Sequence, residues 1–310
     1  MSTTLVTGAA GFAGSHLLDL LAREPAGDIV AWHRPGGAAP SVHASVKSEA
    51  IDMLDRDAVR AAVSRLRPAA VYHCAGAAHV GRAWDRTEAT LAANVRATHH
   101  LLDALDRAGV EARVVIPSSA MVYAPADRAL TEDDPLVPAT PYGLSKVAQE
   151  MLAGHAGGGV TVLVARAFNH IGPRQDPMFA ASAFARSIAD IERGRSEPTI
   201  SVGNLSARRD ITDVRDTVRA YRLILERGRP GEPLNVCSGS AMAIADLLDL
   251  LVARARVPVR IAIDPARYRP HDQPLVLGDA TRIRERLGWT PQIPLDQTVD
   301  DLLQYWRSEE

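Results

Sequence analysis

Short apolar, β-branched runs alternate along the first part of the chain with longer segments whose apolar residues recur at helical spacing. The runs predict strands at residues 4–7, 28–33, 49–52, 70–73, 113–117, 160–165 and 234–236. The longer segments predict helices at residues 12–22, 56–65, 87–108, 141–153, 179–192 and 214–226. Such alternation is typical of a parallel sheet with crossover helices. We therefore expect an α/β fold with a Rossmann-type doubly wound parallel sheet.

This regular alternation weakens after Phe168, where prolines and the segment SVGNLSARRD interrupt it. The remaining chain predicts a strand at residues 259–263 and helices at residues 244–254, 280–287 and 295–306. We expect a dinucleotide-binding domain at residues 1–167, to which residues 211–238 return. A smaller α/β substrate-binding lobe on the C-terminal side would comprise residues 168–210 and 239–310. Because the chain crosses between the two units more than once, a ligand cleft between them is expected.

A glycine-rich loop, TGAAGFAG, follows the first predicted strand and leads directly into a helix. Gly8 permits a tight turn, Gly11 lets a pyrophosphate approach the backbone, and Gly14 lets helix and strand pack closely. Phe12 and Ala13 open the helix, whose positive end would bind the pyrophosphate. The loop therefore predicts a dinucleotide cofactor held by these five residues.

The end of the second predicted strand indicates which dinucleotide binds. Folds that prefer NAD place an Asp or Glu there to hold the ribose 2′-hydroxyl. This strand instead ends in AWHR, which has no carboxylate, and the guanidinium of Arg34 could bind a 2′-phosphate in a forked geometry. We expect NADPH, with NAD(H) as the less favoured alternative.

The charge balance excludes several classes of partner. The 310 residues include 35 basic and 37 acidic side chains, which gives a net charge of −2. A protein that binds nucleic acid or an anionic membrane surface normally carries a basic excess. Neither a long apolar run nor an N-terminal targeting pattern is present, so we expect a cytoplasmic protein without a membrane segment. Cys74 and Cys237 match no metal-binding spacing, and no metal site is expected.

The basic residues are nearly all arginine, and the only lysines are Lys47 and Lys146. Lys146 lies four residues after Tyr142 in PYGLSK, so both side chains would share one helix face. A phenol with a pKa near 10 is a poor acid or base at neutral pH, and a nearby ammonium would lower that pKa. A compact ammonium can also bind the ribose hydroxyls of a nicotinamide nucleotide, a role that the planar guanidinium of arginine would not fill. Ser119, at the end of the fifth predicted strand, would lie at the same sheet edge.

The segments TGAAGFAG, HCAGAA, SSAMVY and YGLSK resemble the extended short-chain dehydrogenases/reductases, in particular the branch that modifies nucleotide sugars. The resemblance implies that Tyr142 is the acid/base, that Lys146 assists it and that Ser119 binds the reacting oxygen. It also implies adenosine contacts from Asp52, Met53, Ala75, Gly76 and Ala77.

The later segments FNHIGP, VGN before an RD pair, and NVCSG resemble the reductases of GDP-4-keto-6-deoxy-D-mannose. This resemblance implies that Asn169 and Arg209 hold the diphosphate and that Arg269 closes on it. His170 could act as an epimerising acid or base, although a structural or sugar-hydroxyl contact is favoured. The implied reaction is NADPH-dependent reduction of the C4 keto group, giving GDP-D-rhamnose for surface polysaccharide synthesis.

Three alternatives remain. A nucleotide-sugar 4-epimerase with tightly bound NAD is disfavoured by the missing acid after the second strand. A 4,6-dehydratase needs acidic groups after the catalytic serine, where this chain has Ala120 and Met121. The same pair departs from the more acidic segment associated with the GDP-sugar reductases and leaves the exact keto sugar open. A non-catalytic NADP-sensing protein would be expected to have lost the Tyr/Lys pair.

The resemblance also implies a homodimer, with helices 87–108 and 141–153 forming a four-helix bundle.

Overall fold

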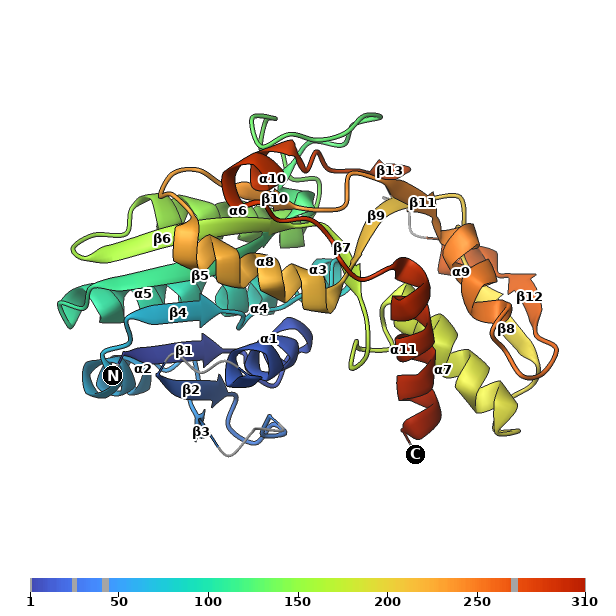
Figure 1. Ribbon diagram of the computed structural model, residues 1–310, viewed down its shortest axis with the longest axis horizontal. Coiled ribbons are helices and arrows are strands. Elements are labelled where there is room, and N and C mark those ends of the chain that lie inside the picture. Colours follow the sequence, from blue (N-terminus) through green and yellow to red (C-terminus); the bar gives the residue numbers. More distant parts are fainter. Residues whose placement is uncertain (1, 24–26, 41–44, 269–272, 310) are drawn as a thin grey trace.

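A seven-stranded parallel sheet forms the larger part of the molecule (Figure 1). The computed structural model describes residues 2–23, 27–40, 45–268 and 273–309. The strand order is β10-β6-β5-β4-β1-β2-β3, and all neighbouring strands are parallel. The strands are β1 (Thr3–Thr7), β2 (Asp28–His33), β3 (Val46–Ala50), β4 (Ala70–His73), β5 (Ala112–Ser119), β6 (Val160–Ala167) and β10 (Leu234–Val236). The predicted Rossmann-type fold is confirmed.

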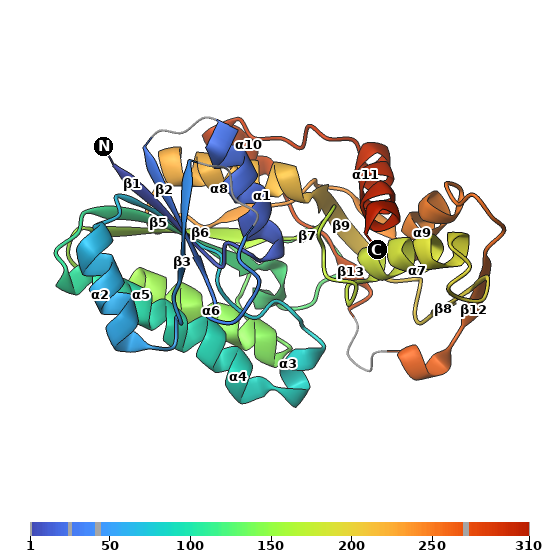
Figure 2. The ribbon, with the colours of Figure 1, turned by 90° about the horizontal axis from the view of Figure 1, so that it is seen from below.

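Helices cover both faces of this sheet (Figure 2). One face carries α1 (Phe12–Arg23), α8 (Val214–Arg227) and α10 (Thr281–Leu287), and the other carries α2 (Arg56–Leu66), α5 (Ala97–Arg107) and α6 (Pro141–Gly154). Side chains alternate along a strand, so the residues of β5 belong to two cores. Val115 lies in the core beneath α1 and α8, and Val114 and Ile116 lie in the core beneath α2 and α5. The apolar run of this strand therefore reflects burial on both faces.

The C-terminal part of the chain forms a smaller lobe with its own core (Figure 1). Strands β7, β9, β11 and β13 make one small sheet there, and β8 pairs with β12. These strands are β7 (Asn169–Ile171), β8 (Thr199–Val202), β9 (Arg208–Asp213), β11 (Ala241–Ala243), β12 (Arg260–Ile263) and β13 (Leu275–Val276). The lobe helices are α7 (Ala180–Glu192), α9 (Ile244–Val252) and α11 (Leu295–Ser308). After β9 the chain returns to the main sheet through α8 and β10; the domain limits given above stay predictions.

Two predicted elements differ in the structure. The third strand is Val46–Ala50 rather than 49–52, because its pairing with β2 places Val46 beside Ile29. The single helix expected at 87–108 is divided into α4 (Thr87–Leu91), a π-helical turn η1 (Ala92–Arg96) and α5. Within that turn, the Asn94 side-chain amide donates to the Ala77 carbonyl at 3.2 Å and accepts from the Ala77 N–H at 2.7 Å. The extra residue of the turn lets Asn94 face inward.

Several short elements went unpredicted because a few residues carry too little periodicity. They are the strands β7, β8, β9, β11 and β13, the helix α3 (Arg82–Asp85) and the 3₁₀ turns η2 (Ala120–Val122) and η3 (Pro265–Arg267).

Candidate active site

The end of β5 and the start of α6 bring three predicted catalytic residues together. Ser119 ends β5, and its Oγ accepts a hydrogen bond of 3.1 Å from the Met121 N–H at the start of η2. Thr140 caps α6 by accepting from the Gly143 N–H at 3.0 Å. A β-carbon at Gly143 would lie 2.2 Å from the Met121 carbonyl oxygen, so only glycine lets α6 approach η2 this closely.

Tyr142 and Lys146 lie on the first turns of α6 and are both 8% exposed. The Lys146 Nζ lies 5.8 Å from the centre of the Tyr142 ring and donates to the Pro117 carbonyl oxygen at 2.9 Å. Burial raises the pKa of Tyr142 to about 12, and a hydrogen bond with Ser119 opposes this rise. We expected the Lys146 ammonium to lower that pKa; instead burial raises it, and the opposing contribution comes from Ser119. The phenol therefore holds its proton at neutral pH, as a proton donor must.

Burial also affects Lys146, whose pKa it lowers to about 8. Nearby Cys74 and Glu150 oppose this shift. The side chain is therefore mostly an ammonium at pH 7 and loses its charge in mildly alkaline solution.

A cavity of about 580 Å³ joins these residues to the glycine loop and to the lobe. It is lined by the start of α1, by the ends of β4 and β5, and by residues of β7, β9, α7 and α9. The predicted site residues that line it are Gly11, Phe12, Ala13, Gly14, Ala75, Gly76, Ala77, Ser119, Tyr142, Lys146, Asn169 and Arg209. The structure thus brings most of the predicted catalytic, cofactor and substrate residues to one place.

The glycine loop has the shape that a pyrophosphate requires. Gly8 has a φ of 64°, and a β-carbon there would lie 2.5 Å from the Ala75 backbone nitrogen. A β-carbon at Gly14 would lie 2.3 Å from the Gly8 carbonyl oxygen. Gly11 lines the cavity just before α1, whose first N–H groups have no partner within the helix. The residues present therefore fit a dinucleotide.

Other predicted cofactor residues lie outside the cavity lining. Gly8 is a packing residue of the loop, as described above. Arg34 is exposed just past the end of β2. The Asp52 carboxylate accepts from the Leu54 N–H at 2.9 Å, and the Met53 carbonyl oxygen accepts from the His100 ring at 3.0 Å. Their contacts with an adenosine stay predictions, and Arg269 lies outside the described residues.

His170 lines the cavity as a neutral ring. Its Nδ1–H donates to the Phe168 carbonyl oxygen at 3.0 Å, and its ring stacks on Phe12 with the centres 5.7 Å apart. Burial lowers its pKa. This arrangement suits a structural or hydroxyl contact better than proton transfer.

Two lining residues were missed by sequence reasoning. Gln175 donates from Nε2 to the His170 carbonyl oxygen at 2.9 Å, and its buried Oε1 has no partner among the described residues. His79 stacks on Phe179, 4.6 Å between ring centres. No sequence motif identifies either residue: His79 meets Phe179 from a distant part of the chain, and Gln175 is oriented by the backbone of the turn after β7.

The described part of the cavity wall favours an anion. It includes Arg82, Lys146 and Arg209, while none of the described lining residues is Asp or Glu. Across the described residues, no cluster of His, Cys, Asp or Glu could hold a metal ion. Within the same residues, every helix is too short or too polar to cross a membrane.

Known proteins resemble this chain over nearly its full length. Residues 5–302 match the model of the GDP-mannose 4,6 dehydratase family. The GDP-6-deoxy-D-mannose reductase of Pseudomonas aeruginosa is 37% identical over 308 residues, covering 98% of this chain and 96% of the relative. The UDP-glucose 4-epimerase of Mycolicibacterium smegmatis is 31% identical over 320 residues, 99% of each chain.

A solved structure agrees with these sequence relatives. The structure described as RMD from Pseudomonas aeruginosa complexed with NADPH superposes with a TM-score of 0.85. It is 33% identical and covers 99% of both chains. The likeness therefore includes the lobe as well as the parallel sheet.

Proposed function

Because the chain belongs to the GDP-mannose 4,6-dehydratase family of the extended short-chain dehydrogenases/reductases, we propose that it reduces the C4 keto group of a nucleotide-linked 4-keto-6-deoxyhexose with NADPH. The favoured substrate is GDP-4-keto-6-deoxy-D-mannose and the favoured product is GDP-D-rhamnose. One observation carries the proposal: Ser119, Tyr142 and Lys146 meet in a cavity whose described lining has no carboxylate. That lining suits ketone reduction better than loss of water.

The chain's own residues would manage the proton and orient the sugar. A nicotinamide cofactor held by Gly11, Phe12 and Ala13 would supply the hydride that the carbonyl carbon receives. Tyr142 donates its phenolic proton to the carbonyl oxygen, which Ser119 polarises by a hydrogen bond. Lys146 then stabilises the phenolate that remains, because an adjacent cation favours the charged form.

NADPH is supported by two features. Arg34 stands at the end of β2, at the sheet edge where a 2′-phosphate would lie, and no acid replaces it. The similar Pseudomonas structure is described as complexed with NADPH. Gly11, Phe12 and Ala13 would hold the pyrophosphate.

The alternatives make different demands on the site. The 4-epimerase relative keeps that activity open, although a tightly held NAD would normally need an acid after β2. A dehydratase would need an acid where Ala120 and Met121 line the cavity. A non-catalytic NADP sensor would have no use for the buried Tyr142–Lys146 pair.

The decisive assay offers the protein NADPH with freshly prepared GDP- and dTDP-linked 4-keto-6-deoxy sugars. Reduction is followed by loss of absorbance at the reduced nicotinamide band, and we expect the GDP sugar to react fastest. Absence of oxidation with every sugar, together with NAD that copurifies with the protein, would overturn the reductase and favour the epimerase.

Arg209 is the proposed diphosphate contact. It lines the cavity from β9, where its guanidinium donates to the carbonyl oxygens of Arg208 and Gln273 at 2.8 and 2.7 Å. A guanidinium held in this way can still bind a phosphate. We expect Arg209→Met to raise the KM for the sugar nucleotide by about 10- to 100-fold with a smaller change in kcat, the effect of one lost charged hydrogen bond.

The neighbouring arginine provides a matched control. Arg208 precedes Arg209 on the same strand, is exposed and donates to the Ala241 carbonyl oxygen at 3.0 Å. Arg208→Met should leave the KM within about twofold, since adjacent side chains on a strand point to opposite faces. Equal KM values for the two variants would remove Arg209 from the substrate site.

A homodimer is proposed from an apolar face on α6. Leu144 and Met151 are 52% and 63% exposed and lie seven residues apart, two helical turns along one face. Exposed apolar patches of this kind mark interfaces. Pairing this face and α4–α5 with a second copy would give the expected four-helix bundle.

We expect the double variant Leu144→Arg/Met151→Arg to be monomeric by light scattering. Ile263 is an exposed residue of the lobe, and Ile263→Arg should stay dimeric. An unchanged mass in the double variant would exclude this interface.

A further inference from the structure

Glu150 lies on α6 one helical turn after Lys146. Its side chain is 8% exposed. Its carboxylate accepts a hydrogen bond from Ser118 Oγ at 2.5 Å. Ser118 stands between Pro117, whose carbonyl oxygen accepts from Lys146, and Ser119. Glu150 thus contacts the strand end that carries the proposed polarising serine.

The same carboxylate forms a buried ion pair with Arg166 of β6. The Arg166 guanidinium donates from Nε to both carboxylate oxygens at 3.1 and 3.2 Å and from Nη2 at 2.8 Å. Arg166 has only 5% of its side chain exposed. A buried pair with this many hydrogen bonds allows little movement of either side chain.

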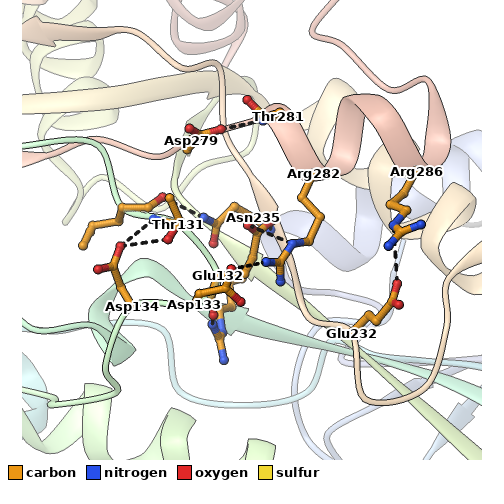
Figure 3. A network of polar contacts seen from close by, with 12 residues as sticks. Thr131, Glu132, Asp133, Asp134, Glu232, Asn235, Asp279, Thr281, Arg282 and Arg286 are labelled. Carbon is orange, nitrogen blue, oxygen red and sulfur yellow. Dashed lines mark hydrogen bonds and ion pairs between the residues drawn. The ribbon is translucent and has the colours of Figure 1, made fainter.

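Arg166 is itself held at its other end. Its Nη1 donates to Tyr123 Oη at 2.9 Å and to the Glu132 carbonyl oxygen at 3.0 Å. Glu132 continues the network, as Figure 3 shows: it accepts from the Asn235 N–H at 2.9 Å and pairs with Arg282 at 3.5 Å. The place of Glu150 is therefore fixed from β6, β10 and α10.

We propose that Glu150 is a positioning residue, which ties the end of β5 to α6 and sets the electrostatic surroundings of Lys146. The tie keeps Pro117 and Ser119 at fixed distances from Lys146 and Tyr142. The negative charge of Glu150 favours the ammonium form of Lys146, and the ion pair with Arg166 holds that carboxylate in place. This proposal rests on the proposed roles of Tyr142 and Lys146.

The groups around Lys146 define what its titration reports. On its own helix these are Tyr142 and Glu150, and Arg166 of β6 pairs with Glu150. From β4 and the residue after it, His73 and Cys74 face it. His73 stays neutral because burial and the Lys146 charge lower its pKa, and burial keeps the Cys74 thiol protonated by raising its pKa. Glu150 is thus the nearby anion that acts on Lys146 at neutral pH.

The scarcity of lysine makes this titration directly measurable. Protein labelled with ¹³C at lysine Cε should give two lysine signals, from Lys146 and from Lys47, which is exposed and serves as internal reference. Glu150→Gln leaves Arg166 as an uncompensated cation, so we expect the Lys146 midpoint to fall by about one pH unit or more, a tenfold change in its proton affinity. Arg166→Gln should move it the opposite way. Neither cofactor nor sugar is needed, so this result is separate from any failure of the proposed reaction.

A second ion pair supplies the structural control. Glu192 pairs with Arg307 at 2.7 Å in the lobe, with 7% of its side chain exposed. Glu192→Gln should destabilise the fold to a similar degree and leave the Lys146 midpoint unchanged. If the role of Glu150 is purely structural, the Lys146 midpoint will not shift in Glu150→Gln. That result would overturn the proposal, and so would an equal shift of the midpoint in Glu192→Gln.

Ser118→Ala tests the tie itself and keeps the proposal falsifiable if a charge variant does not fold. It removes one hydroxyl group and no charge. We expect kcat to fall about tenfold or more, with the NADPH dissociation constant and sugar KM within twofold. A parental kcat in this variant would contradict a positioning role for the Ser118–Glu150 contact.

Discussion

Tyr142→Phe is expected to lower kcat by about 10²- to 10⁴-fold, the range associated with loss of a general acid. The phenol is buried, hydrogen-bonded with Ser119 and protonated at neutral pH because burial raises its pKa to about 12. Removing only the hydroxyl leaves the ring in place, so cavity shape and cofactor binding should be preserved. Kinetics with the keto sugar measure the first effect, and quenching of protein fluorescence by NADPH measures the second.

The control for this variant is Tyr305→Phe, on α11 outside the cavity lining. It should retain parental kcat and cofactor affinity. If Tyr142→Phe keeps more than about a tenth of the parental kcat, the proton comes from another group. A loss of NADPH binding in the same variant would instead indicate that the Tyr142 hydroxyl is needed to bind the cofactor, so the fall in kcat could not be assigned to proton transfer.

Lys146→Arg is expected to weaken NADPH binding and lower kcat, each by about tenfold or more, as for loss of a buried charged hydrogen bond. The Lys146 side chain is 8% exposed and donates to the Pro117 carbonyl oxygen at 2.9 Å. A guanidinium is larger and planar, so it cannot occupy this space and keep the same contact. Fluorescence titration with NADPH and steady-state kinetics measure the two effects.

Lys47→Arg is the matched control, since it is the same substitution at the other lysine, whose side chain is 70% exposed. It should behave as the parent. The parental chain should also lose NADPH affinity as pH rises through about 8, because the buried ammonium is deprotonated there. An arginine at 146 that binds NADPH as tightly as lysine would show that charge alone is needed.

The sequence predicted the parallel sheet well because strands buried on both faces form continuous apolar runs, as in β5. It placed β3 three residues too late, since an edge strand such as VKSEA has few apolar residues to define its limits. The short lobe strands were missed for a related reason: their pairing depends on partners far along the chain, such as Asn169 beside Ile211.

The candidate site was predictable where chemistry depends on spacing within one segment. The glycine loop and the Tyr142–Lys146 pair are local patterns, and the structure places both at the cavity. Glu150 and Gln175 were not foreseen because their roles arise from contacts with β5, β6 and the His170 backbone. An abundance of arginine also hid Arg166, since sequence alone cannot separate a buried guanidinium from a solvated one.

The π-helical turn around Asn94 adds one residue to a turn of what is otherwise one long α-helix. One additional residue rotates everything that follows by about 100° relative to what precedes it. Downstream, Thr98 Oγ1 lies 2.9 Å from His73 Nε2, and Leu101 and Leu105 are fully buried. Loss of a single residue between Ala92 and Arg96 would turn all three away from the sheet. We therefore expect this helix to tolerate the substitution of a side chain far better than the insertion or deletion of a single residue.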